Sequence, residues 1–173
     1  MYENKQITEP KWKSWIIQTT TPLFTPDQCN QIIASGRAQK PQQAQVGINK
    51  PGGGTNTKKR VTTISWIPFQ EMGHMYQDLN KFIQQANENH FGFGDIQVTE
   101  QAQFTEYPEG GFYDWHMDCD VNMEHEPPVR KISMTLLLND PSEFEGGDLE
   151  LMAPGKYAEL KQGHAICFAS FLN

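Results

Sequence analysis

A succession of short β-type segments fills the second half of the chain and constrains the fold most. Gln97–Tyr107 alternates, Phe112–Asp118 is rich in aromatic residues, and Ile132–Leu138 is an almost continuous apolar run. Three more segments follow at short intervals with Gly and Pro between them: Asp148–Met152, Tyr157–Lys161 and His164–Ser170. Many short strands at close spacing are typical of a sandwich or barrel. The pattern therefore predicts an antiparallel β-domain of jelly-roll type over residues 96–173.

The first half has a different pattern, in which helices dominate. Thr25–Gln28 combines an N-cap threonine, a proline at the first helical position and a glutamine able to complete a capping box. An apolar stripe at helical spacing predicts a second helix over Phe69–Ala86. Short strands are expected at Ser14–Thr19 and Arg60–Ile67, and a flexible loop at Gln39–Lys59.

Together these patterns predict a mainly β protein with supporting N-terminal helices (α+β). Residues 1–95 form the strand and helix support, with the loop at 39–59, and residues 96–173 form the β core. The chain has 173 residues, of which 37% are hydrophobic, a length and composition that suit one structural domain.

Charge and cysteine content narrow the functional classes. The formal net charge of −7 gives no overall attraction to nucleic acid or anionic membranes, and the basic run Lys58–Arg60 is interpreted as a solvated loop. Three cysteines without a CxxC pair suggest reduced thiols. No apolar signal segment occurs near Met1, so a soluble, cytoplasmic protein is expected.

The stretch FYDWHMDCD contains the clearest candidate for chemistry. His116 and Asp118 stand two residues apart, so on a strand both side chains project from the same face. With a second imidazole they would form a 2-His-1-carboxylate triad, which suits Fe(II) and leaves coordination positions open. H-x-D alone also fits an ordinary surface pair, and the surrounding motifs have to decide between the two.

Four motifs follow one another in a fixed order: Tyr107–Asp118 (YPEGGFYDWHMD), Arg130–Ser133 (RKIS), Gly146–Leu149 (GGDL) and Gly163–Phe171 (GHAICFASF). This series resembles the prolyl 4-hydroxylase-like branch of the Fe(II)/2-oxoglutarate-dependent oxygenases, over roughly residues 96–173. The resemblance implies a double-stranded β-helix, meaning a jelly roll whose open mouth holds the iron. It also implies Fe(II), 2-oxoglutarate and O2 as cofactor and co-substrates, with ascorbate often keeping the iron ferrous.

The resemblance assigns roles residue by residue. His116 and Asp118 correspond to metal ligands, and Tyr107 to a tyrosine that lines the 2-oxoglutarate pocket, although an ordinary buried aromatic is the alternative. Tyr113 is expected to pack or to contact substrate, and Arg130 either contacts substrate or forms a salt bridge. The implied reaction hydroxylates a C–H bond, often of a prolyl residue, in a peptide, a protein or a small molecule.

The third metal ligand is the point at which the pattern departs from the family. There, a second histidine and later a basic anchor for 2-oxoglutarate follow the last motif, but the sequence ends at Asn173. The expectation is a truncated oxygenase lacking its last strands. His125 and His164 are weaker candidates for the missing ligand, and a catalytically inactive jelly-roll binding module is the alternative function.

Overall fold

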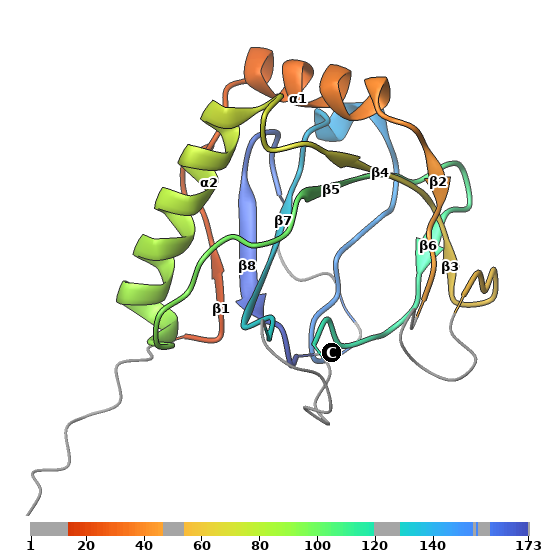
Figure 1. Ribbon diagram of the computed structural model, residues 1–173. Helices are drawn as coiled ribbons and strands as arrows, with labels where there is room; N and C mark the ends of the chain where they lie inside the picture. Colours follow the sequence, from red (N-terminus) through yellow and green to blue (C-terminus); the bar gives the residue numbers. More distant parts are fainter. Residues whose placement is uncertain (1–13, 47–53, 120–128, 154, 156–159, 173) are drawn as a thin grey trace, which may run out of the picture.

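The computed structural model describes residues 14–46, 54–119, 129–153, 155 and 160–172. In this part of the chain three small antiparallel sheets and two long helices enclose the core (Figure 1). The architecture is mostly β with few helices, in agreement with the predicted class.

The central sheet has the order β1-β8-β7, formed by Ile16–Gln18, Ala165–Ala169 and Ile132–Leu136. All residues of β8 are buried, which explains why this strand is a continuous apolar run rather than an alternating one. Ile132 pairs with Ala169, so the start of β7 lies beside the end of β8.

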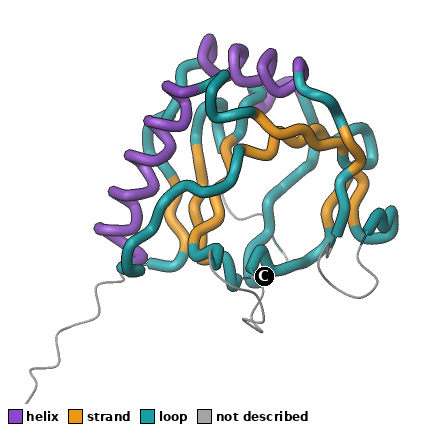
Figure 2. The backbone as a smooth tube through the Cα atoms, viewed as in Figure 1, coloured by secondary structure: helices purple, strands orange, loops and turns teal. Residues whose placement is uncertain are grey.

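Two further sheets complete the β structure. One has the order β2-β4-β5, formed by Gln42–Gln43, Thr63–Ile67 and Ala102–Glu106, and the other pairs β3 (Arg60–Val61) with β6 (Phe112–Tyr113). Each of the three sheets therefore contains strands from both sides of residue 95. Figure 2 shows these short strands separated by long loop segments.

Helix α1 (Pro26–Ala38) begins as the sequence predicts. The Thr25 side chain accepts a hydrogen bond from Gln28 N, and the Gln28 side chain accepts one from Thr25 N, completing the capping box. The helix packs over β4 at the top of the view in Figure 1.

Helix α2 (Gly73–Ala86) begins later than the expected Phe69 because a turn precedes it. Glu71 N donates to Pro68 O, and the N-cap residue Met72 makes no side-chain cap. The helix continues into a π-helical turn, Asn87–Phe91, which Gly92 closes in a left-handed conformation. In the described part of the chain, neither helix combines the length and apolar character that crossing a bilayer requires.

The main hydrophobic core lies between the two helices and strands β4 and β5. Its buried members are Phe24, Cys29, Ile32, Ile67, Met75, Tyr76, Leu79 and Phe104. A smaller cluster joins Ala86 and Phe91 to Cys167 of β8, so α2 also covers the central sheet.

Several expected strands differ in the structure. The segment at Phe112–Asp118 is a strand only at β6, because the Asp114 side chain accepts from Trp115 N and turns the chain. Asp148–Met152 is not a strand; it follows two glycines with positive φ and has no ladder partner among the described residues. Tyr157–Lys161 falls largely outside those residues. A closed double-stranded β-helix is not seen in the part of the chain described.

The expected long loop contains regular structure at both ends. β2 lies within it, and Val46 and Gly54 form an isolated bridge. Residues 47–53, with most of the glycine run, are outside the described residues.

Candidate metal centre

His116 and Asp118 lie in the loop after β6, with their donor atoms facing each other. The His116 Nε2 to Asp118 Oδ1 distance is 3.1 Å. The other ring nitrogen, Nδ1, lies 2.7 Å from the Asp114 carbonyl, which accepts hydrogen bonds only, so Nδ1 carries a proton. Nε2 is thus the ring nitrogen that faces the carboxylate: with a proton it donates a hydrogen bond to Oδ1, and without one it can bind a metal.

The Asp118 segment is fixed to the end of the central strand. Asp118 N and Cys119 N both donate to Ser170 O, each at 3.1 Å. Ser170 is fully buried, directly after β8, and its hydroxyl lies 3.0 Å from that of Ser133 on β7. The two serines thus connect the Asp118 segment to the β7-β8 pair.

The surroundings of Asp118 keep its side chain ionised. Desolvation raises the pKa of this carboxyl, but hydrogen bonds from His116 and Ser133 and the positive charges of His116 and Arg130 outweigh it. The net result is a pKa below the usual value of 3.8. Once Nε2 has given up its proton, the carboxylate and the imidazole nitrogen are a suitable donor pair for a divalent metal such as Fe(II).

Tyr113 lies against the His116 ring. The two ring centroids are 3.6 Å apart with an interplanar angle of 15°, so the rings are stacked. The guanidinium of Arg60 lies over the Tyr113 ring, 4.2 Å from its centroid. On a continuous strand two residues three positions apart face opposite ways, but the chain leaves β6 after Tyr113 and brings Tyr113 and His116 together.

Tyr107 follows β5 and is 53% exposed at the edge of this group. Partial desolvation raises the pKa of its phenol, Arg60 opposes the rise, and Tyr113 and Asp118 add to it. The turn after it is tight: Gly111 N donates to Pro108 O at 2.7 Å, and Gly110 has a φ of 70°. The tyrosine predicted to contact the co-substrate therefore lies within electrostatic range of the His116–Asp118 site.

Arg130 forms the salt bridge that was one of its two expected roles. Its Nη2 lies 2.5 Å from Glu100 Oε2, and Nη1 donates to Asp118 O at 3.3 Å. The arginine thus ties the Asp118 segment to the residues before β5.

The two alternative histidines are not brought to the pair. His164 lies just before β8, where its Nδ1 is 3.1 Å from Thr19 O. Ser170, which holds Asp118, lies at the other end of that strand, about 20 Å away at the usual rise per residue. His125 is outside the described residues, and within those residues no group of three or more His, Cys, Asp or Glu is close enough to hold a metal.

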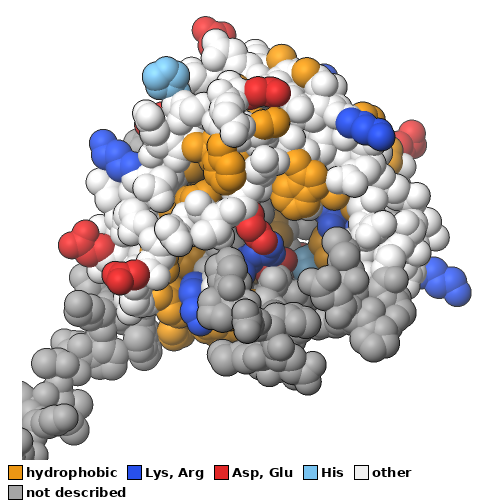
Figure 3. All heavy atoms as spheres, viewed as in Figure 1, with side chains coloured by type: hydrophobic (Ala, Val, Ile, Leu, Met, Phe, Trp, Pro, Cys, Tyr) orange, Lys and Arg blue, Asp and Glu red, His pale blue; other side chains and the backbone are white. Residues whose placement is uncertain are grey.

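Large apolar side chains close to the pair in sequence are exposed on the surface. Phe112, Trp115 and Met117 are each at least 40% exposed, and Met117 stands between the two candidate ligands. Figure 3 shows the molecule hollowed near the centre of this face, where acidic, basic and histidine side chains gather between hydrophobic ones. Exposed apolar groups beside a polar centre are typical of a binding surface.

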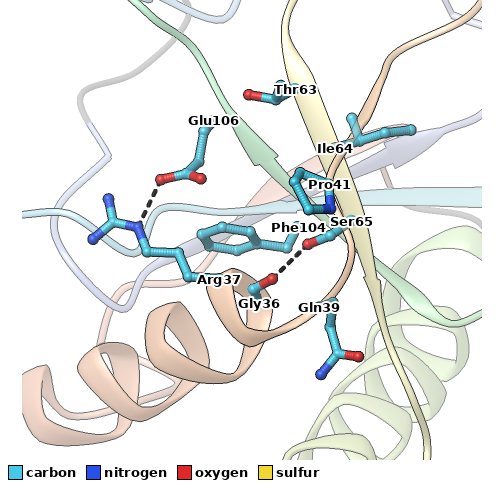
Figure 4. Close-up of a pocket in the computed structure, with 9 residues that line it drawn as sticks. All are labelled: Gly36, Arg37, Gln39, Pro41, Thr63, Ile64, Ser65, Phe104 and Glu106. Carbon is cyan, nitrogen blue, oxygen red and sulfur yellow. Dashed lines mark hydrogen bonds and ion pairs between the residues drawn. The ribbon is translucent and has the colours of Figure 1, made fainter.

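A separate pocket lies between α1, β4 and β5 (Figure 4). Phe104 forms part of its lining, the carboxylate of Glu106 is paired with Arg37 at 2.7 Å, and Ser65 Oγ donates to Gly36 O. Phe104 and Glu106 share one face of β5, whereas Gln103, which binds Arg60, lies on the other. The pocket is thus on the opposite face of β5 from the metal-ligand candidates.

Sequence reasoning did not identify Arg60, Ser133 and Ser170 as part of this centre. Arg60 had been interpreted as the end of a solvated basic run, and the serines belong to motifs that were used only for the resemblance. All three act through contacts with residues distant in sequence, for which the local sequence contains no signal.

Comparisons with known proteins show what the chain is similar to. Residues 102–173 match the family model described as the 2OG-Fe(II) oxygenase superfamily. A PKHD-type hydroxylase of Gluconacetobacter diazotrophicus is 38% identical over 61 residues, a match that covers 34% of this chain and 27% of that protein. The chain thus matches about a quarter of that relative's length.

A solved structure shows the same fold. The crystal structure of a Pseudomonas putida prolyl-4-hydroxylase aligns with a TM-score of 0.57 and 20% identity, covering 90% of this chain and 81% of that one. The predicted relationship to prolyl 4-hydroxylase-like proteins is confirmed, whereas the positions of the functional residues stay predictions.

Proposed function

We propose that the protein is an Fe(II)- and 2-oxoglutarate-dependent dioxygenase, because residues 102–173 match the model of the 2OG-Fe(II) oxygenase superfamily. The observation that carries the proposal is the 3.1 Å approach of His116 Nε2 to Asp118 Oδ1, while Nδ1 donates to the Asp114 carbonyl. A proton on Nε2 joins these two atoms when no metal is bound, and a divalent cation bound by both would replace that proton.

His116 and Asp118 would hold the iron, and a third ligand would come from outside the described residues. The iron, with 2-oxoglutarate and O2, supplies the oxidising power that hydroxylates an unactivated C–H bond. Tyr107 would donate its hydroxyl to the co-substrate, since its raised pKa keeps the phenol protonated. Arg130 and Ser170 would keep Asp118 in place, and ascorbate would keep the iron ferrous.

The proposed substrate is a prolyl residue in a peptide or protein. Two observations support it: the relatives are named as a PKHD-type hydroxylase and a prolyl-4-hydroxylase, and Phe112, Trp115 and Met117 expose apolar surface beside the centre. Proline-containing segments dock on aromatic surfaces because their extended conformation is preformed. The net charge of −7 argues against nucleic acid or a membrane as partner, and a cytoplasmic location is proposed from the cysteine content.

Anaerobic titration with Fe(II) in the presence of 2-oxoglutarate tests the metal assignment, because the chelated complex has a weak visible charge-transfer band. The 173-residue chain is compared with one extended through the natural downstream sequence. A band that H116A and D118A abolish, and that the matched control H74A on the exposed face of α2 retains, is the expected result. No band in either chain would refute the proposal.

The two chains also separate the possible sources of the third ligand. A band only in the extended chain would place that ligand downstream, whereas a band in both would place it within these residues, and H125A would then test His125. With the band established, a prolyl peptide should gain one oxygen as 2-oxoglutarate is converted to succinate. Succinate formation without peptide oxidation would refute the prolyl substrate alone.

A catalytically inactive binding module is the second candidate, because the described residues bring together two metal ligands and not three. It predicts peptide binding with the same affinity with and without Fe(II), and with D118A as well as the unmodified chain.

A further inference from the structure

Arg60 is the one charged side chain that is buried in the described part of the chain, with 7% of the residue exposed. Burying a cation is unfavourable unless hydrogen bonds or opposite charges compensate for the lost water. Here Nε donates to Thr62 Oγ1 at 3.0 Å and Nη2 donates to Gln103 Oε1 at 2.8 Å, and both acceptors are neutral. Thr62 lies between β3 and β4 and Gln103 lies on β5, and these two contacts leave the guanidinium with one orientation.

That orientation places the guanidinium over the ring of Tyr113. Arg60 pairs with Tyr113 across the β3-β6 ladder, and its Cζ lies 4.2 Å from the centre of the tyrosine ring. The Tyr113 ring in turn stacks on His116, with 3.6 Å between centroids. Cation, phenol and imidazole therefore form a stack that runs from a buried position to the candidate metal ligand.

The imidazole of His116 is held in two ways. The Asp114 carbonyl accepts from Nδ1 and fixes where that edge of the ring points, whereas the stack on Tyr113 fixes the plane of the ring. The direction in which Nε2 points depends on both contacts. A carbonyl behind a metal-binding histidine is common, but the second constraint here depends on a residue of the N-terminal half.

We propose that Arg60 is a positioning residue for the metal centre, which acts on His116 through Tyr113. The proposal rests on the proposed binding of iron by His116. Arg60 touches neither metal nor substrate in this role; it holds the Tyr113 ring, and the ring holds the imidazole plane. Partners behind a metal ligand typically change metal affinity by about 10- to 100-fold.

A double-mutant cycle tests whether Arg60 acts through Tyr113. The variants are R60M, Y113L and R60M/Y113L, with dissociation constants for Co(II), an air-stable substitute for Fe(II), measured by calorimetry. R60M and Y113L should each weaken Co(II) binding about 10-fold, and the double variant should bind no more weakly than Y113L. Y113F keeps the aromatic ring and should retain most of the affinity.

The matched control is R37M. Arg37 also forms a side-chain hydrogen bond to a distant strand, at Glu106, but it is exposed and belongs to the separate pocket. Its loss should leave Co(II) binding unchanged. R60K serves as the milder variant if R60M does not fold, as judged by circular dichroism; it keeps the charge without the planar fork and should weaken binding by less than R60M.

A metal-free measurement separates this proposal from the proposed function. In nitrogen NMR spectra of the imidazoles, R60M or R60K should shift the His116 resonances toward a mixture of tautomers, whereas R37M should not. Unchanged His116 resonances would overturn the positioning role. So would a double-mutant cycle in which R60M lowers the Co(II) affinity of the Y113L variant as much as that of the unmodified chain. Changed resonances in a protein that binds no metal would overturn the proposed function alone.

Discussion

Gly163 lies where the segment before α1 meets the start of β8, and replacing it with alanine should destabilise the protein strongly. Its φ is +77°, a region that residues with a Cβ avoid at a cost of about 1–2 kcal/mol. A Cβ there would lie 2.0 Å from the carbonyl oxygen of Phe24. The backbone on one side would have to move.

That movement would break hydrogen bonds as well. The Gly163 carbonyl accepts from Leu23 N at 2.7 Å and from Phe24 N at 3.3 Å. At about 0.5–1.5 kcal/mol each, their loss adds about 1–3 kcal/mol to the backbone strain. The total, about 2–5 kcal/mol, is a large part of the ~5–15 kcal/mol by which a protein is usually stable.

Gly146 provides the matched control. Its φ is +73°, but a Cβ there meets nothing within 4 Å, so G146A should cost only the strain of about 1–2 kcal/mol. The two variants reduce the entropy of the unfolded chain equally, and that contribution cancels. Urea unfolding followed by circular dichroism gives both free energies. A loss in G163A no larger than that in G146A would refute the close approach of Phe24 and Gly163.

Three other predictions concern buried polar groups. Y76F should lose about 1–3 kcal/mol of unfolding free energy, because the Tyr76 hydroxyl donates to Ile67 O and accepts from Ala102 N inside the core; an unchanged urea midpoint would contradict this. Burial raises the pKa of Cys167 from 9.0 to about 12, so the unfolded state releases its proton first as pH rises. The contribution of the Cys167 thiol to the unfolding free energy should therefore be fully present below pH 9. Above pH 9 the unfolding free energy should fall by up to ~1.4 kcal/mol per pH unit, and C167A should reduce this slope. An identical slope in C167A would contradict the raised pKa. Iodoacetamide at neutral pH should label Cys119 and reach Cys167 only after denaturation, and labelling of both in the native protein would show that the burial is wrong.

Local interactions account for what the sequence predicted well. The capping box at Thr25 involves residues three positions apart, and the structure has it as expected. The apolar stripe of α2 was also predicted correctly, but the predicted start of the helix was wrong. The apolar pattern extends back into a turn before the helix, in which Glu71 N donates a hydrogen bond to Pro68 O. The aromatic-rich segment Phe112–Asp118 was likewise predicted as a longer strand than β6, and the chain turns where the Asp114 side chain accepts from Trp115 N.

In the candidate site, too, only the residues with a local sequence signal could be predicted. The spacing of His116 and Asp118 identified two residues whose donor atoms face each other in the structure, although their role as ligands stays a prediction. Arg60 could not be identified, because a cation in a basic run is normally solvated. Its burial depends on Gln103 and Tyr113, both far along the chain.

One methionine separates the two candidate ligands, yet different sheets hold them. His116 is held by Tyr113 and Arg60 of the β3-β6 pair, whereas Asp118 is held through Ser170 by the β1-β8-β7 sheet. The 3.1 Å between their donor atoms therefore depends on how the two sheets are placed, as well as on the local chain. A metal bound by both would join the two sheets directly, and binding to the native state alone would stabilise the fold. Since β1 and β3 belong to the N-terminal half, the geometry of the centre depends on residues outside the segment 102–173 that carries the family match.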